Sequence, residues 1–458
     1  MDAEVEQTIN AIGYAKVLVA LKPQAVAGVA TRGAAAAAAS AEQSIVDKFL
    51  RPSEDQAANL ELIAVSTASR RFKRPIDAGQ RRVRVYPRLG LAIGYVDQSK
   101  AAALSADSRV ESIVKAPELS LIRPEVSQKA QSTAPKISWG IQRMRVPALW
   151  NAGFIGEGVI VGHLDTGIDG KHPALKNAIH AFAEFDMAGD KVLDAKPWDS
   201  DTHGTHTAGT IVGRATPRGS FGVAPGAKVV SAMVIEGGQV IDRVLAGMEW
   251  TLEQGARILS MSLGLRGFTP AFEVVTNALR AQNVLPIFAV GNEGPNTSRS
   301  PGNYDNVISV GAMDVKDRVA NFSSSQKFQQ PANRVVPDLV GPGVDILSCI
   351  PGNDYVELNG TSMATPHIAG LAALLLQAKP NATADQLETA IQDSCQRPNT
   401  LDPARANRGL PDAVVAFTKL TGSAPVQSAA KKKPKIGARK KAIKKKSKRK
   451  AKKKKGRR

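Results

Sequence analysis

Hydrophobic residues in the middle of the chain form short runs, and segments with a helical pattern separate these runs. Five apolar segments of four to seven residues have the length and composition of strands. Strands of this kind alternating with helices are typical of a parallel sheet that is covered on both faces. We therefore predict an α/β fold with a doubly wound, mostly parallel sheet, whose site lies at the carboxyl ends of the strands. The predicted strands are residues 159–164, 228–233, 258–261, 284–290 and 307–310, and the predicted helices are residues 242–254 and 271–282.

The first part of the chain has a different pattern, which predicts a separate small α+β domain over residues 1–125. It contains four short apolar runs and one helical pattern, together with an alanine run at residues 34–39 and a basic stretch at residues 70–74. Residues 126–138 are polar and contain proline, which is typical of an exposed linker. The predicted strands are residues 15–22, 83–86, 91–95 and 109–114, and the helix is residues 99–104.

The charge of the chain is concentrated at its end. The formal net charge is +20, but residues 431–458 hold 19 of the 61 lysines and arginines and no acid. The first 430 residues are left with 42 basic and 41 acidic side chains, so this part is almost neutral. We predict one large domain at residues 139–420 and a disordered polybasic tail at residues 421–458. The 431–458 segment would bind nucleic acid or another polyanion, or would act as a passive solubilising tail.

Several classes of protein are excluded by composition. No apolar run approaches the roughly 18 residues that span a bilayer, so we expect no membrane span. The two cysteines, Cys349 and Cys395, exclude a disulfide framework; we expect two free thiols, with a single bridge as the alternative. The acidic N-terminus does not resemble a secretory signal, so we expect a cytoplasmic protein unless the start codon is misassigned.

Three segments of the large domain carry candidate chemistry. Asp165 ends the first predicted strand, His203 opens a predicted helix, and Ser362 follows an Asn-Gly turn at the start of a very apolar helix. An acid, an imidazole and a hydroxyl are the parts of a nucleophilic triad, in which the imidazole removes the proton of the hydroxyl during attack. A serine at a helix N-terminus also lies beside free backbone N–H groups that can bind an oxyanion.

Each of these residues also has a simpler interpretation. An aspartate after a strand is often a turn residue, and a Thr-Ser pair before a helix is often an N-cap. His203 and His206 have a spacing that suits two metal ligands, but no glutamate accompanies them as in zinc-protease helices. These interpretations do not explain why all the elements occur together on one α/β scaffold.

The segments at residues 164–169, 201–209 and 359–370 resemble, in the order Asp, His, Ser, the three signature motifs of the subtilisin-like serine proteases. Residues 289–294 resemble the oxyanion-hole segment of that family, and residues 223–225 and 262–264 resemble its structural and substrate-strand segments. The resemblance implies a subtilisin-like fold and a serine endopeptidase. It implies that Ser362 is the nucleophile, His203 the general base and acid, Asp165 its orienting group, Asn292 the oxyanion donor, and Ser262, Leu263 and Gly264 the strand that binds substrate.

The resemblance also directs attention to specificity and to metals. Arg299 stands two positions before the Pro301–Gly302 turn, where many relatives have a small residue at the base of a substrate pocket. There it would favour an acidic side chain before the cleaved bond; the alternative is that it points to solvent. Ala174 and the cationic 214–219 loop depart from the calcium-binding members of the family, so we expect no metal and no cofactor.

The first domain resembles the inhibitory propeptide of the family in its pattern, best over residues 91–124. This implies a self-processed precursor whose own N-terminal domain is an intramolecular inhibitor of peptide hydrolysis. We expect processing in the linker, between about Leu119 and Ile137, with a mature end near Ala134. Two other functions are less consistent with the sequence. A non-catalytic binding protein would be expected to lack a triad residue, and a lipase or esterase would have a Gly-x-Ser-x-Gly sequence around Ser362.

Overall fold

The computed structural model describes residues 1–22, 84–127, 137–235, 240–329 and 334–426. Several features named in the sequence analysis lie outside these residues: the alanine run, the basic stretch, most of the 126–138 linker and most of the predicted polybasic tail. Among the described residues, no helix is both long enough and apolar enough to cross a membrane. Both cysteines are free thiols, as expected, and Cys349 is buried.

A seven-stranded sheet forms the centre of the large domain, and every neighbouring pair of its strands is parallel. The five strands predicted from apolar runs all belong to it, so the predicted α/β fold is confirmed. The strand order places the first strand of the domain, β7, between β10 and β9. In that order the strands are β17 (Leu339–Pro342), β14 (Ile308–Met313), β12 (Leu285–Ala289), β10 (Ile258–Met261), β7 (Ile160–Asp165), β9 (Lys228–Met233) and β8 (Ile179–Glu184).

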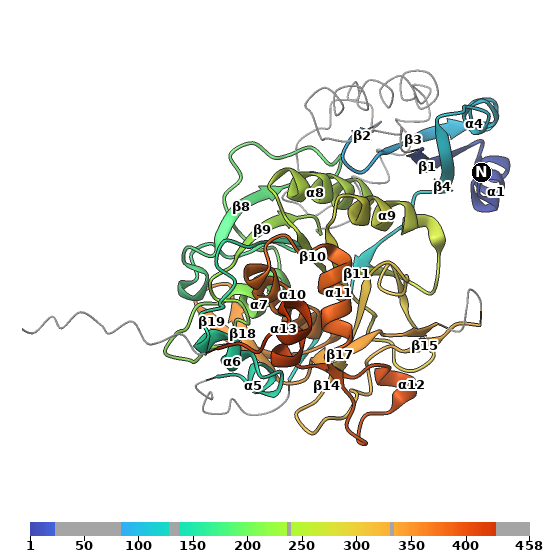
Figure 1. The fold of residues 1–458 in the computed structure, drawn as a ribbon. Coiled ribbons are helices and arrows are strands. Elements are labelled where there is room, and N and C mark those ends of the chain that lie inside the picture. Colours follow the sequence, from blue (N-terminus) through green and yellow to red (C-terminus); the bar gives the residue numbers. More distant parts are fainter. Residues whose placement is uncertain (23–83, 128–136, 236–239, 330–333, 427–458) are drawn as a thin grey trace, which may run out of the picture. The chain divides into compact units, whose positions relative to one another are not determined.

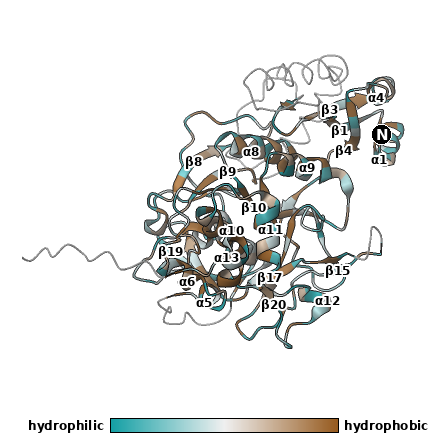
Figure 2. Cartoon of the chain, viewed as in Figure 1, coloured by the Kyte–Doolittle hydropathy of each residue, from teal (hydrophilic) through white to brown (hydrophobic). Residues whose placement is uncertain are grey.

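Helices cover both faces of this sheet (Figure 1). Helices α7 (His203–Val212), α10 (Thr361–Ala378) and α13 (Ala413–Thr421) share one apolar cluster, and α8 (Ile241–Glu253) and α9 (Glu273–Ala281) share the other. Helix α10 contains no Asp, Glu, Lys or Arg, and its first sixteen residues are all buried. A helix that is apolar on every side is stable only in the interior, and Figure 2 shows the hydrophobic positions gathered around α10.

Shorter elements complete the described part of the chain. They are β5 (Ser120–Leu121), β6 (Glu125–Val126), α5 (Trp139–Arg143), α6 (Val146–Asn151), η1 (Pro173–Leu175), β11 (Leu263–Arg266), η2 (Pro270–Phe272), β13 (Arg299–Ser300), β15 (Gln326–Lys327), β16 (Val335–Val336), β18 (Ile346–Ile350), β19 (Asp354–Asn359), α11 (Ala384–Gln392), β20 (Cys395–Gln396), α12 (Pro403–Ala406) and β21 (Leu410–Pro411).

The N-terminal residues form a four-stranded antiparallel sheet in the order β2-β3-β1-β4, whose strands coincide with the four predicted apolar runs. Two helices pack on one of its faces through Val5, Ile9, Ala101 and Leu104. The first of these helices was not predicted, although Val5 and Ile9 are one helical turn apart and Asp2 caps its start. The elements are α1 (Ala3–Ile12), β1 (Tyr14–Leu21), β2 (Arg84–Tyr86), β3 (Leu91–Asp97), α4 (Gln98–Ser105) and β4 (Val110–Lys115).

The opposite face of the small sheet contacts helix α8 of the large domain. Apolar side chains of β1 and β3 share one cluster with those of α8. Lys16 pairs with the buried Asp242, whose backbone carbonyl accepts a hydrogen bond from the hydroxyl of Tyr86 at 3.2 Å. Glu249 accepts the backbone N–H groups of Arg88 and Leu89 at 2.9 and 3.2 Å. The contact between the small sheet and α8 therefore combines an apolar surface with hydrogen bonds to the backbone N–H groups of the loop between β2 and β3.

Close backbone packing places the start of α7 against the loop that follows β7. Gly167 has a φ of 123°, and a Cβ on Gly204 would lie only 2.1 Å from the carbonyl oxygen of Gly167. Asp199 supports this contact because its carboxylate accepts the hydroxyl of Thr166 at 2.7 Å and the backbone N–H of Thr205 at 2.6 Å. The end of β7 and the start of α7 are thereby held at a fixed separation.

Replacing Gly204 by alanine should separate these two elements. The added methyl group cannot fit against a backbone oxygen, so α7 must shift; overpacking of this kind costs about 1–3 kcal/mol of stability. We expect Gly204→Ala to lower the melting temperature and to reduce peptide hydrolysis at least about tenfold, because about 1.4 kcal/mol corresponds to a factor of ten. Thermal unfolding and hydrolysis rates check this, and unchanged values for both would contradict it.

Candidate functional site

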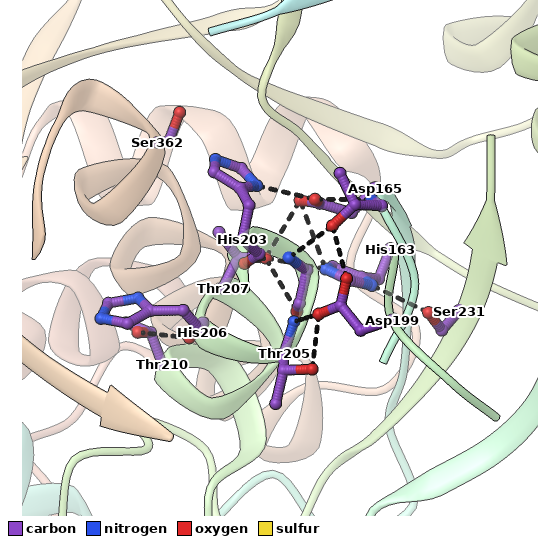
Figure 3. A network of polar contacts seen from close by, with 12 residues as sticks. His163, Asp165, Asp199, His203, Thr205, His206, Thr207, Thr210, Ser231 and Ser362 are labelled. Atoms are coloured by element: carbon purple, nitrogen blue, oxygen red, sulfur yellow. Dashed lines mark hydrogen bonds and ion pairs between the residues drawn. The ribbon is translucent and has the colours of Figure 1, made fainter. Parts of the chain in front are cut away.

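The candidate residues meet at the carboxyl end of the central sheet. Asp165 is the last residue of β7, His203 is the first residue of α7, and Ser362 is the second residue of α10. Asn292 follows the end of β12 by three positions. Figure 3 shows the His203 ring between the carboxylate of Asp165 and the side chain of Ser362. The sequence motifs are thus brought to one place although nearly 200 residues separate the first from the last.

Asp165 and His203 form a buried pair. The Nδ1 atom of His203 lies 2.7 Å from Oδ1 of Asp165, and both side chains are at most 2% exposed. Burial alone would raise the pKa of Asp165, but the charge and hydrogen bond of His203 outweigh it and lower the value to about 2. Burial likewise opposes the charged form of His203, but the Asp165 carboxylate outweighs it and raises the pKa of the imidazole.

Ser362 and Asn292 both donate hydrogen bonds to one extended stretch of the chain. The hydroxyl of Ser362 donates to the carbonyl of Ile122 at 2.7 Å, and Nδ2 of Asn292 donates to the carbonyl of Arg123 at 2.9 Å. The orientation of the Asn292 amide is fixed, because its Oδ1 accepts the backbone N–H and the hydroxyl of Thr361 at 3.0 and 2.8 Å. Within the described residues, Nε2 of His203 is buried without a hydrogen-bond partner.

The stretch that contacts Ser362 is residues 120–127, which we call the cleft segment. Its first part, β5, pairs antiparallel with β11, and the backbone N–H of Ile122 donates to the carbonyl of Ser262 at 3.0 Å. Its second part, β6, pairs antiparallel with β19. Of the predicted substrate strand, Ser262, Leu263 and Gly264 thus all contact or pair with this segment.

Sequence reasoning did not find this placement, because it assigned residues up to 125 to the first domain and expected processing near Ala134. One signal was present: Leu119 and Leu121 alternate with polar residues, and both pack in the cluster that contains Leu263. Because residues 128–136 lie outside the described part, processing in the 126–138 linker stays a prediction.

Arg299 lies beside the cleft segment and is only 6% exposed, so the alternative that it points to solvent is wrong. Its Nε and Nη2 atoms donate to Oε1 of Glu293 at 3.0 and 2.5 Å. Its Nη1 atom donates to the hydroxyl of Ser120 and to the carbonyl of Gly264, each at 3.0 Å. Arg266 also lies 3.5 Å from Glu293, so two cations share one carboxylate and leave a local positive charge.

The other helix histidine, His206, has its own partners. Its Nε2 atom lies 2.9 Å from the carbonyl oxygen of Ile346, and burial lowers the pKa of the imidazole to about 3. His203 and His206 are therefore engaged in different directions and do not converge on one ion. Over the described ranges, no group of three or more His, Cys, Asp or Glu side chains is arranged to hold a metal.

Two segments where this chain departs from the calcium-binding members of the family, Ala174 and the 214–219 loop, do not fit a cation. Ala174 has no side-chain oxygen and is buried. The guanidinium of Arg214 donates to the carbonyls of Val212, Ala227 and Asn177 at 3.1, 3.0 and 3.3 Å. A fixed positive side chain thus already occupies the carbonyl oxygens that could otherwise coordinate calcium.

The arrangement has the parts that nucleophilic attack on a carbonyl requires. An imidazole held by a carboxylate can accept a proton, a hydroxyl lies at the N-terminus of a long helix, and a fixed amide N–H can stabilise an oxyanion. The strand β11 presents backbone groups that bind an extended peptide in front of these side chains. Such a site suits acyl transfer from a polypeptide.

Comparisons with known proteins agree with this description. Residues 156–419 match the family model described as the subtilase family. The chain is 37% identical over 263 residues to subtilisin BL of Lederbergia lenta, which covers 57% of this chain and 92% of that protein. It is 39% identical over 258 residues to an intracellular serine protease of Paenibacillus polymyxa, covering 54% and 76%. Identity to subtilisin E of Bacillus subtilis (strain 168) is 33% over 301 residues, covering 64% and 74%.

The raised pKa of His203 predicts the acid side of the pH profile. An imidazolium cannot accept a proton, so activity should be lost as the pH falls through the pKa of His203, at a midpoint above the ordinary value of 6.5. Asp165→Asn should move that midpoint down, because burial then acts on His203 without the opposing carboxylate. Measuring kcat/KM for a peptide against pH checks this; a wild-type midpoint below 6.5 would contradict it.

Proposed function

The chain belongs to the subtilase family and is a subtilisin-like serine protease, and on this premise we propose that it hydrolyses peptide bonds through an acyl-enzyme on Ser362 as a self-processed precursor. The observation that carries the proposal is the meeting of Ser362 and Asn292 with consecutive carbonyls of a peptide strand.

In the proposed reaction His203 takes the proton of Ser362 as the hydroxyl oxygen attacks the substrate carbonyl. Asn292 and the backbone N–H groups at the start of α10 stabilise the oxyanion that forms. His203 then gives its proton to the leaving amine, and an ester remains on Ser362. Water attacks this ester by the same path, with His203 again accepting and returning a proton. Asp165 holds the ring in one tautomer and stabilises the imidazolium.

We propose that the cleft segment is the inhibitory part of the N-terminal region. It occupies β11 on one side of Ser362 and β19 on the other, and Arg123 adds an ion pair with Asp201 at 3.2 Å. While the cleft segment is bound, the hydroxyl of Ser362 donates its hydrogen bond to the carbonyl of Ile122. The proposed oxyanion donor Asn292 donates to the next carbonyl, that of Arg123. For attack, Ser362 and Asn292 must contact the same carbonyl, and the hydroxyl of Ser362 must donate its proton to His203. The position of the cleft segment meets neither condition, which supports a role in inhibition.

Substrates are proposed to replace the cleft segment as an extended strand on β11. Ile122 is fully buried and precedes the bond that Ser362 addresses, which favours an apolar residue at that position of a substrate. Arg299 contacts Ser120, two residues earlier, and Glu293 already pairs with most of its guanidinium. We therefore propose that Arg299 selects a hydroxyl or acidic side chain at the position of Ser120. This proposal replaces the acid directly before the cleaved bond that the sequence alone predicted, because Arg299 contacts the position of Ser120 and not that of Ile122.

Ser362→Ala tests the nucleophile and self-processing together. The change removes one oxygen and should leave the fold intact, while hydrolysis of casein and labelling by a fluorophosphonate probe fall at least about a thousandfold. The variant should accumulate at full length, whereas the wild-type protein should not.

Mass spectrometry of the processed wild-type protein then locates the cut. A new N-terminus at Arg123 would place the cut at the Ile122–Arg123 bond, whose carbonyl Ser362 contacts. A new N-terminus within residues 126–138 would place the cut in the linker. Equal processing of the wild-type protein and the variant would contradict self-processing, and retained hydrolysis by the variant would contradict the assignment of Ser362.

Cleavage of a peptide library tests the role of Arg299. We expect a preference for Asp, Glu, Ser or Thr two residues before the amino acid that precedes the cleaved bond. Arg299→Gln should lose the acidic preference and keep that for hydroxyls, because the amide still donates but carries no charge. Arg266→Ala is the matched control, since this exposed cation shares Glu293 but not Ser120. An acidic preference directly before the bond, or none, would overturn the proposal for the Ser120 position.

We further propose that the polybasic tail binds nucleic acid. Nineteen cations without an acid over residues 431–458 would displace condensed counterions from a phosphate backbone, so binding should weaken steeply with salt. Deleting residues 429–458 should abolish salt-sensitive binding to a fluorescent DNA duplex, measured by anisotropy, and should not change peptide hydrolysis. DNA binding that survives the deletion, or that is absent in the intact protein, would show that the tail has another role.

A further inference from the structure

His163 is a buried imidazole for which the proposed reaction has no role. It lies two positions before Asp165 on β7, and residues at this spacing on a strand point to the same face. Its side chain is 1% exposed and faces α7, the helix that begins with His203. A polar side chain buried in this way is retained at a cost unless its hydrogen bonds are made, so its partners indicate its purpose.

Both ring nitrogens of His163 have hydroxyl partners. Nδ1 lies 3.0 Å from Oγ of Ser231, its register neighbour on β9, and Nε2 lies 2.9 Å from Oγ1 of Thr207 on α7. The hydroxyl of Thr207 donates to Oδ2 of Asp165 at 3.0 Å. Figure 3 shows these side chains as one connected set behind the carboxylate, on the side away from Ser362.

Charge decides which nitrogen of His163 holds the proton. Nε2 lies 3.6 Å from Oδ2 of Asp165, so a proton on Nε2 is attracted by the carboxylate, and a bare Nε2 would be repelled by it. Burial lowers the pKa of His163, and this outweighs the Asp165 carboxylate, so the ring is neutral. The hydroxyl of Ser231 then donates to Nδ1, and Nε2–H donates to Thr207.

This direction of donation determines what Thr207 can do. Its hydroxyl has one proton and three acceptors nearby: Oδ2 of Asp165 at 3.0 Å and the carbonyls of Gly204 and His203 at 3.1 and 3.2 Å. A hydroxyl that accepts an N–H donates more strongly, and the charged acceptor gains most from that. In the opposite tautomer the proton of Thr207 would turn toward His163 and leave Asp165.

We propose that His163 is a positioning residue that acts through Thr207 to fix the second oxygen of Asp165. Oδ1 of Asp165 is held by the backbone N–H of Thr166 at 2.7 Å and by His203, and within the described residues Thr207 is the donor to Oδ2. The inference rests on the proposed function, in which Asp165 must orient His203. It extends the site by an uncharged chain of hydrogen bonds, which we call the relay, from Ser231 on β9 through His163 on β7 to Thr207 on α7.

Four variants of the full-length chain, assayed after processing, test this relay. His163→Leu removes both ring contacts, and Thr207→Val removes the hydroxyl. His163→Gln restores them, because its amide can donate to Thr207 and accept from Ser231. Thr210→Val is the matched control: it removes a buried hydroxyl one turn along α7 that donates to the carbonyl of His206 and not to Asp165.

We expect His163→Leu and Thr207→Val each to lower kcat about tenfold with KM unchanged, because tenfold corresponds to about 1.4 kcal/mol, roughly the contribution of one hydrogen bond. A fifth protein that combines His163→Leu with Thr207→Val should be no less active than Thr207→Val alone, because both changes break one chain of contacts. His163→Gln should recover most of the activity, and Thr210→Val should keep it. Melting temperatures of all variants separate lost stability from lost turnover.

Two results would overturn the relay. One is a kcat for His163→Leu equal to that of Thr210→Val, and the other is an additive loss in the double variant. If His163→Leu folds poorly, Thr207→Val and His163→Gln decide the question. A kcat that falls in Thr207→Val and also falls in His163→Gln would then overturn the relay. Asp165→Asn distinguishes failure of the relay from failure of the proposed function, because unchanged activity in that variant would refute the triad itself.

Discussion

The buried contact between Asp165 and His203 is the constraint on which the rest of the site depends. A carboxylate and an imidazole that are both removed from water are stable only when each satisfies the other, and their 2.7 Å contact does this. The contact requires the end of β7 and the start of α7 to lie at one separation, which the close approach of Gly204 to Gly167 allows. Small backbone groups, not large side chains, therefore determine the distance at which the chemistry operates.

The apolar helix α10 determines the position of the hydroxyl. Its buried residues pack across the strands of the central sheet, so the first turn has no freedom to move relative to β7. Ser362 and the Asn292-binding Thr361 stand in that first turn. The core that stabilises the domain therefore also brings Ser362 and Asn292 to the same stretch of chain, where they contact the carbonyls of Ile122 and Arg123.

Much of the fold and of the site could be predicted from the sequence. Apolar runs such as residues 228–233 and 258–261 coincide with strands of the sheet, because parallel strands buried on both faces require a continuous apolar composition. Asp165, His203 and Ser362 were predicted as a triad from their residue types, and Asn292 was predicted from the family resemblance; the structure brings all four together. The helix at Ala3–Ile12 was missed, since only two of its residues are buried and the pattern is weak.

The sequence by itself determined the order of the elements, the neutral body with its basic tail, and the residue types of the site. Only the tertiary structure decided three things: that residues 120–127 lie across Ser362, that Arg299 is buried against Ser120, and that Thr207 links His163 to Asp165. The physical reason is the same in each case. These contacts join segments far apart in the chain, and their geometry depends on side-chain directions and strand register, which local patterns do not contain.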